Sequence, residues 1–358
     1  MIVLKKFKLL GALALSSLIS IGLFSGCGSS NNTADNGTVY FYNCGDYIDE
    51  DLLAKFTKET GIKVDYSTYD TNEIMYQKLK STPGSYDLVI PSDYMIEKMI
   101  NNDMLQKLDF SKIPNYANID EQFKNLPYDP NNEYSIPYMW GTMGIVYNKT
   151  MVTEPVDSWD ILWDSKYDDQ IFMYDSERDS IMVALKKLGY SMNTRDEAQL
   201  EEAKQLLIEQ APLVLAYVGD EGKNKMINGE AALMLAWSGD AMVMLQENPD
   251  LAYAIPKEGS NWFVDGMVMS KDAANVEQAY QYMNFLCRPD IAAKNAEYIG
   301  YSTPISAARE LLPEEIKNSE VAYPDPSILK KDNMEMFNDP SDIISLYSSI
   351  WTEVKASN

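Results

Sequence analysis

The stretch VYFYNCGDYIDEDLLAKFTKETGIKVDYSTY, residues 39–69, decides the fold. Four of residues 39–43 are aromatic or apolar, which is typical of a buried strand. Residues 49–61 carry apolar side chains at helical spacing and end in Gly61, a common helix terminator. Residues 62–69 read as a second strand. A strand, a helix and a strand in this order predict a parallel sheet with helices on its faces.

The same alternation continues along the chain. A helix over 71–81, a strand over 86–91 and a helix over 92–105 follow directly. Further predicted elements are strands at 171–175, 229–237, 251–256 and 263–270 and helices at 180–190, 238–248 and 275–299. The chain has 358 residues, which is more than one core usually covers. We therefore predict an α/β protein of two lobes, with ligands bound where strands lead into helices.

Composition excludes several classes of function. The formal charge of −24 disfavours binding to nucleic acid and would attract a cationic ligand. The sequence contains no histidine, which removes Ser-His-Asp and Cys-His catalysis and histidine-ligated metals. It also lacks phosphate-binding, dinucleotide-binding, CxxC and EF-hand motifs. We predict no cofactor and no metal, while an enzyme that uses carboxylates alone passes this filter.

The N-terminus predicts export. Lys5, Lys6 and Lys8 precede a largely apolar segment, 9–24, and small residues follow it. The ending at Cys27 resembles a bacterial lipoprotein signal, which implies removal of residues 1–26 and a lipid on Cys27. The polar segment 27–37 then reads as a tether that holds the protein at the extracytoplasmic face of the membrane, at the cell surface or in the periplasm. The alternative is an uncleaved membrane anchor.

The two remaining cysteines are predicted to be free thiols, since two cysteines make no disulfide framework. Cys287 lies in an apolar segment of helical spacing and reads as a core residue. Cys44 lies at the end of the first strand. Without a histidine to activate it, we interpret it as a wall residue and not as a nucleophile.

Acidic residues lie beside aromatic residues at several predicted strand ends. Each acid alone could be a helix cap or a first-turn acid. The repeated pairing instead suits an ammonium ligand, because a carboxylate binds the charge and a ring covers the methylenes. The acids are Asp46 beside Tyr47, Asp175 and Asp179 around "SER", Asp240 after Trp237, and Asp265 after Trp262 and Phe263. Asp49, in the same region as Asp46, is expected to be solvated and without a role.

Several segments together resemble the polyamine-binding (spermidine/putrescine) proteins of ABC transporters. They are VYFYN, LLAKFTKETGIKVDYSTYDTNE, YDLVIPSDY, YSIPYMWGT, VDSWDILW, ALKKLGYSMNT, IPKEG, NFLCRPD and IGYSTP, in preserved order. The resemblance implies a binding protein that is no enzyme, with a type II two-lobed periplasmic-binding-protein fold and a ligand cleft between the lobes. Its partners would be a polyamine and the permease subunits of the transporter. The expected lobes are 38–143 with 266–325, and 144–265 with 326–358, hinged near 143 and 265.

The resemblance also implies site residues. It places Gly45, Asp46, Tyr47, Ser92 and Tyr94 on the first lobe as ligand contacts. It further implies that Asp179 binds an amine, that Trp237 stacks on the carbon chain, and that Asp265 is the carboxylate for the central amine. Asp240, Phe263 and Tyr301, the last at the side of the site, are also implied as ligand contacts. This sequence departs from the family pattern at three positions: Cys44 stands for a tryptophan, Ser176 for an aspartate and Glu335 for a glutamine. The preference between spermidine and putrescine therefore stays open.

Two other functions are compatible with the residues. If the acids are surface caps, the protein could carry another cation or a sugar. Paired acids could also serve a carboxylate-dependent glycosidase, although nothing in the sequence marks one acid as the proton donor.

Overall fold

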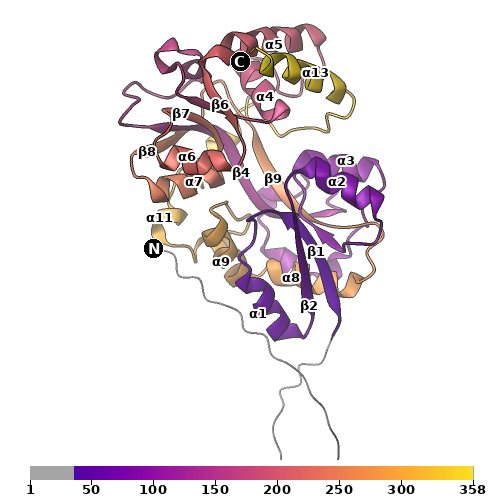
Figure 1. Cartoon of the computed structure of the whole chain (residues 1–358). Helices are drawn as coiled ribbons and strands as arrows, with labels where there is room; N and C mark the ends of the chain where they lie inside the picture. Colours follow the sequence, from indigo (N-terminus) through magenta and orange to yellow (C-terminus); the bar gives the residue numbers. More distant parts are fainter. Residues whose placement is uncertain (1–35, 358) are drawn as a thin grey trace, which may run out of the picture. The chain divides into compact units, whose positions relative to one another are not determined.

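The computed structural model describes residues 36–357 (Figure 1). The predicted signal peptide, Cys27 and residues 28–35 of the tether lie outside the described residues. Within residues 36–357, no helix has both the length and the apolar character needed to cross a membrane.

The opening stretch forms the predicted strand, helix and strand. Strand β1 (Thr38–Cys44) pairs in parallel with β2 (Lys63–Tyr69) and with β3 (Leu88–Val89). Helix α1 (Asp51–Thr60) connects the first two strands and ends at Gly61, whose φ of 75° is easily adopted by glycine. Helices α2 (Asn72–Ser81) and α3 (Asp93–Asn101) follow β2 and β3. The predicted parallel βαβ arrangement is confirmed.

The second group of elements contains β5 (Ile171–Tyr174), β6 (Val214–Val218), β7 (Leu233–Trp237) and β8 (Leu251–Ala254). Strand β5 lies between β6 and β7 and is parallel to both. The helices of this group are α4 (Glu177–Lys187), α5 (Glu197–Gln210), α6 (Glu221–Ile227), α7 (Ser238–Glu247) and α13 (Ile344–Lys355).

Strand β4 (Ser135–Asn148) links the two groups. Its first part, as far as Thr142, pairs antiparallel with β9 (Trp262–Met269), which itself pairs with β3. From Met143 onward it pairs with β7 and β8 instead. Figure 1 shows β4 and β9 running between the two groups of elements. The predicted two-lobed α/β fold is confirmed, with a strand order of β2-β1-β3-β9-β4-β7-β5-β6.

The predicted long helix over 275–299 is wrong, because the segment forms two helices. Helix α8 (Val276–Leu286) ends before Cys287, and α9 (Pro289–Ile299) begins with a proline. Arg288 has φ −72° and ψ 136°, an extended conformation. The ring of a proline disfavours helical geometry in the residue before it, so Pro289 interrupts the helix.

The C-terminal part of the chain contains three short helices before α13. They are α10 (Ser306–Arg309), α11 (Glu314–Lys317) and α12 (Pro326–Leu329). Helix α13 then packs against α4 and α5, where Tyr347, Ile350 and Trp351 join a core of buried aliphatic side chains. The end of the chain is therefore held against the second group of elements, which contains β5 to β8.

Candidate ligand-binding site

Asp265 on β9 is a buried carboxylate without a basic partner. Its side chain is only 8% exposed, and its Oδ2 accepts a hydrogen bond of 2.5 Å from the Tyr47 hydroxyl. Ser92, at the start of α3, forms an isolated bridge with Asp265 and also hydrogen-bonds its carboxylate. Among residues 36–357, no lysine or arginine forms an ion pair with it. Burying a charge in this way is costly unless a cation pairs with it.

The buried environment of Asp265 raises the pKa of its carboxyl group. Burial raises the pKa of Asp265 to about 6, although hydrogen bonds from Tyr47 and Ser92 and the charge of Arg178 act in the opposite direction. Burial also raises the pKa of the Tyr47 phenol, so this hydroxyl remains a donor. The carboxylate is thus charged at neutral pH and still short of a positive partner.

Aromatic rings surround this carboxylate. The Tyr47 and Tyr301 rings meet edge to face at 5.3 Å, and Phe263 lies 6.1 Å from Tyr301. Beyond them, Tyr174 stacks on Trp237 with ring centroids 4.2 Å apart. Such rings attract a cation and cover apolar carbons at the same time.

Asp240, in the first turn of α7, is the second buried acid of the site. It is 7% exposed, and its Oδ2 accepts a hydrogen bond of 3.1 Å from the Tyr174 hydroxyl. Lys223 Nζ lies 3.4 Å from its Oδ1. Burial raises the pKa of Asp240, and the lysine opposes this shift.

Asp179, in the first turn of α4, is the third buried acid. Ser176 Oγ donates a hydrogen bond of 2.6 Å to its Oδ2, and an Arg178 nitrogen lies 3.5 Å from the same oxygen. Its Oδ1 is buried without a hydrogen-bond partner. The Arg178 guanidinium lies 4.1 Å from the centre of the Tyr94 ring, so it connects α4 with α3 across the two groups of elements.

The remaining predicted contacts differ in their surroundings. Gly45 and Asp46 are exposed in the connection between β1 and α1, next to Tyr47. The Tyr94 hydroxyl already donates to Glu73 Oε1 at 2.9 Å, so its ring is the part that faces Arg178. The structure therefore places four of the predicted contacts near the carboxylate of Asp265: Tyr47, Ser92, Phe263 and Tyr301. Trp237 lies near Asp240, and Arg178 connects Tyr94 with Asp179.

Both cysteines in the described residues are free, as predicted. Cys287 is 1% exposed in the core. Cys44 is half-buried, and burial, followed by the charge of Asp265, raises the pKa of its thiol to about 12. A thiol that keeps its proton at neutral pH is a poor nucleophile, which supports the interpretation of Cys44 as a wall residue.

Sequence reasoning missed four residues of the site. Tyr174 lies near the end of the predicted strand 171–175 and Arg178 precedes Asp179, so their positions could have indicated a role. Asp93 and Lys223 gave no signal. Asp93 is 1% exposed, and its oxygens accept backbone hydrogen bonds from Tyr94 at 2.7 Å and Val264 at 3.3 Å. Burial raises the pKa of Asp93 to about 8, and the charge of nearby Asp265 adds to the shift.

The expectation that Asp49 is solvated is wrong. Asp49 is 8% exposed; its Oδ1 accepts the backbone N–H of Asp51, and Lys294 Nζ lies 3.1 Å from its Oδ2. It satisfies a backbone donor at the start of α1, where a negative charge is favourable. Its role is structural.

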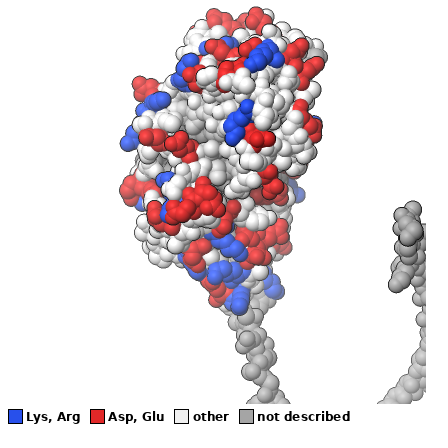
Figure 2. All heavy atoms as spheres, turned by 90° about the vertical axis from the view of Figure 1, so that its left-hand side faces the viewer, with Lys and Arg blue, Asp and Glu red and all other residues white. Residues whose placement is uncertain are grey.

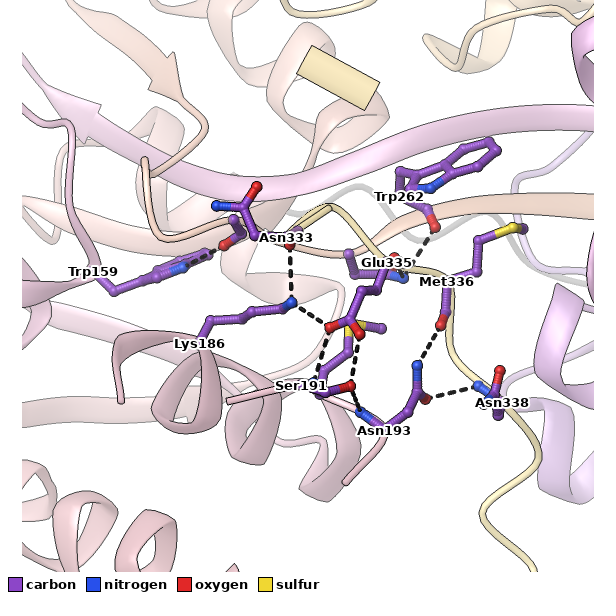
Figure 3. Close-up of polar contacts among 12 residues, drawn as sticks. Trp159, Lys186, Ser191, Asn193, Trp262, Asn333, Glu335, Met336 and Asn338 are labelled. Atoms are coloured by element: carbon purple, nitrogen blue, oxygen red, sulfur yellow. Dashed lines mark hydrogen bonds and ion pairs between the residues drawn. The ribbon is translucent and has the colours of Figure 1, made fainter. Parts of the chain in front are cut away.

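The carboxylate of Glu335, one of the departures from the family pattern, is occupied by the chain itself (Figure 3). It forms an ion pair with the buried Lys186 of α4 and accepts hydrogen bonds from Ser191 Oγ at 2.6 Å and the Met192 N–H at 3.0 Å. The backbone of Glu335 pairs with Asn261 and Trp262 at the start of β9. Glu335 thus fastens the C-terminal segment to α4 and β9.

Acidic side chains are prominent on one face of the molecule. Figure 2 shows a contiguous acidic group near the middle of that face, with basic residues more scattered around it. Such a surface favours the approach of cations over long distances. Within residues 36–357, no group of three potential ligand side chains could hold a metal ion.

Comparisons with known proteins identify the family of the chain. Residues 51–323 match the family model described as bacterial extracellular solute-binding protein. The chain is 42% identical to the spermidine/putrescine-binding periplasmic protein of Salmonella typhimurium, over 92% of this chain and 94% of that protein. It is 32% identical to the putrescine-binding periplasmic protein PotF of Escherichia coli, over 90% and 92% of the two chains.

A solved structure is similar over nearly the same length. The spermidine/putrescine ABC transporter substrate-binding protein PotD of Streptococcus pneumoniae is 44% identical, with a TM-score of 0.81 and coverage of 90% of this chain and 99% of that one. A putative spermidine/putrescine ABC transporter protein from Listeria monocytogenes gives 43% identity and a TM-score of 0.85, with coverage of 90% and 99%. The chain belongs to the bacterial extracellular solute-binding protein family.

Proposed function

We propose that this protein is the extracytoplasmic substrate-binding component of an ABC importer and that its ligand is a polyamine, spermidine or putrescine. The observation that carries the proposal is Asp265, a carboxylate that is 8% exposed, lacks a basic partner among the described residues and is bordered by aromatic rings. The names of relatives of up to 44% identity support it.

The surroundings of Asp265 suit an alkylammonium group. An ammonium next to Asp265 supplies the missing positive charge, and Tyr47 and Ser92 hold the carboxylate in place. The rings of Phe263 and Tyr301 then cover the adjacent methylenes. The stacked pair of Tyr174 and Trp237 extends this apolar surface. An inorganic cation would pair with the carboxylate but would bury none of the apolar surface of the rings, because it has no methylenes.

Lobe closure is part of the proposal. The partner change in β4 between Thr142 and Met143 supports a hinge near residue 143. The second crossing, predicted near 265, stays a prediction. The predicted division into 38–143 with 266–325, and 144–265 with 326–358, stays a prediction. It would place Tyr47 and Ser92 on one lobe and Asp179 and Trp237 on the other. Closure would then exclude water from the carboxylates and strengthen each ion pair.

Calorimetry tests the proposed ligand. Spermidine or putrescine should bind to the purified protein with one site, and a maltodextrin of similar length should give no heat of binding. Polyamine binding should weaken as salt is added, because each ion pair is partly screened. An absence of binding to both amines, or tighter binding of the sugar, would overturn the proposal.

Anchoring and delivery complete the proposal. The lipid on Cys27 would hold the protein near the permease subunits to which it delivers the ligand, and the tether would allow it to reach them. Cys27→Ala is expected to leave polyamine affinity unchanged, because β1 begins only at Thr38. The variant should move from the membrane fraction to the soluble fraction. If it stays with the membrane, the apolar segment 9–24 is itself the anchor and the lipoprotein assignment is wrong.

A further inference from the structure

The carboxylate of Asp240 is already occupied by groups of the chain. Lys223 Nζ lies 3.4 Å from Oδ1, and the Tyr174 hydroxyl donates to Oδ2 at 3.1 Å. Asp240 is 7% exposed, and the Lys223 side chain is 28% exposed. The site thus contains an ammonium group of its own, which we call the resident ammonium.

The resident ammonium is paired with Asp240 and is also influenced by the charges of acids from separate parts of the fold. Lys223 belongs to α6, which packs against α7, the helix that carries Asp240. Burial lowers the pKa of Lys223, but the charges of Asp240, Asp220 and Asp46 outweigh this and raise it. Asp220 directly precedes α6, and Asp46 follows β1 in the other group of elements. Lys223 therefore remains charged next to the acids that a ligand ammonium would also seek.

Asp179, Asp240 and Asp265, the three buried acids among the predicted contacts, differ in their positive partners. Asp179 has Arg178 at 3.5 Å, and Asp240 has Lys223 at 3.4 Å. Asp265 has neither as an ion-pair partner, although Arg178 acts on it electrostatically. Tyr301 interacts electrostatically with both Asp265 and Asp240. Asp265 is therefore the vacant carboxylate, with a resident cation at each of the other two.

We infer that Lys223 is a specificity-determining residue, whose ammonium takes the place beside Asp240 that a ligand ammonium would otherwise occupy. The inference rests on the proposed function. A diamine with one ammonium at Asp265 needs only one further place for its other charge. A triamine with its central nitrogen at Asp265 carries a charged arm on each side, so one arm must approach the resident ammonium. Lys223 therefore disfavours triamines more strongly than diamines.

Calorimetry on matched lysine variants tests this inference. Lys223→Met should tighten spermidine binding by about tenfold or more, the scale of one hydrogen bond to a charged group, and change putrescine binding much less. Lys225→Met is the control, because it removes the same charge from the same helix. Lys225 lies 5.8 Å from the centre of the Phe172 ring and forms no ion pair within the described residues. It should leave the ratio of the two affinities as in the wild type.

Two further variants keep the test decisive. Lys223→Gln removes the charge but keeps a donor for Asp240, and it should act in the same direction if Lys223→Met folds poorly. Lys223→Met combined with Asp240→Asn should lose the gain, because no carboxylate is then released. Circular dichroism checks that each variant is folded.

The outcomes separate this inference from the proposed function. If the wild type binds neither amine, the proposed function fails. A second outcome is that the wild type binds both amines, while Lys223→Met and Lys223→Gln have the same ratio of spermidine to putrescine affinity as Lys225→Met. In that case only the inference on Lys223 fails. If Lys223→Met and Lys223→Gln bind both amines more weakly, or if both variants fail to fold, Lys223 is a structural counter-ion. Either result would also overturn the inference.

Discussion

Asp265→Asn is expected to lower polyamine affinity by about tenfold to a hundredfold, since a hydrogen bond to a charged group contributes roughly 1.5–3 kcal/mol. Asparagine nearly preserves the shape of the side chain and can still accept the Tyr47 hydroxyl, which donates at 2.5 Å in the wild type. The loss therefore reports the missing charge and not a change in packing. Calorimetry with spermidine and putrescine measures it.

The same substitution should make the empty protein more stable at neutral pH. The pKa of Asp265 is raised to about 6 in the folded protein, so the fold holds this proton more tightly than the unfolded chain does. The contribution of Asp265 to stability is therefore present at low pH and is lost as pH rises from about 4 to about 6. Asparagine avoids that loss. Weaker binding together with higher stability of the empty protein would identify Asp265 as a residue kept for its ligand.

The pH profile provides an internal check. Affinity of the wild type should fall by about tenfold for each pH unit below 6, because the carboxylate must lose its proton before it pairs with an ammonium. The Asp265→Asn variant should lack this dependence. Asp51→Asn is the control, since Asp51 is an exposed acid of α1 with 86% of its side chain accessible. If Asp51→Asn weakens binding as much, and salt removes both effects, the protein only attracts cations through its net charge.

The sequence predicts the first βαβ unit because its signals are local. Gly61 ends α1 and Thr71 caps α2 through its side chain, each within one turn of the helix it terminates. The helix break at Pro289 also has a local signal, which the apolar periodicity of 275–299 obscured. No sequence pattern marks strand β4, since almost all of it is buried and it contains Pro137, Gly141 and Gly144. Alternation, the usual signal of a strand, disappears when both faces are covered.

The site was only partly predictable for a related reason. Asp265 and Asp240 could be selected because each follows an aromatic residue by two or three positions in the sequence. Lys223 and Asp93 meet these acids only through tertiary contacts, so no pattern within their own segments marks them. Asp49 resembles Asp46 in sequence, but the Asp51 N–H and Lys294 give it a structural role. A residue's partners decide its role here, and most partners are distant in the chain.

The second large effect is expected for Gly239→Ala, which should lower the free energy of unfolding by roughly 1–3 kcal/mol, the usual cost of overpacking, and weaken polyamine binding measured by calorimetry. A Cβ on Gly239 would lie 2.1–2.4 Å from three atoms of the Tyr301 ring. The ring must move, and it contacts Tyr47 at 5.3 Å and Phe263 at 6.1 Å, both proposed ligand contacts. By helix propensity alone, alanine would stabilise helix α7 by up to about 1 kcal/mol relative to glycine. A loss of stability and affinity in Gly239→Ala would therefore come from the clash with Tyr301 and not from helix propensity.

A double-variant cycle shows whether Gly239 acts through Tyr301. Tyr301→Ala removes the ring and should itself weaken binding, because one face that covers the ligand is lost. If the only effect of Gly239→Ala is to displace that ring, then adding it to Tyr301→Ala should cost no further affinity, since the added Cβ then has room. Additive losses would mean instead that Gly239→Ala disturbs the start of α7 and with it Asp240. In that case the close approach between α7 and Tyr301 would fix the position of Asp240 and not the position of the aromatic rings near Asp265.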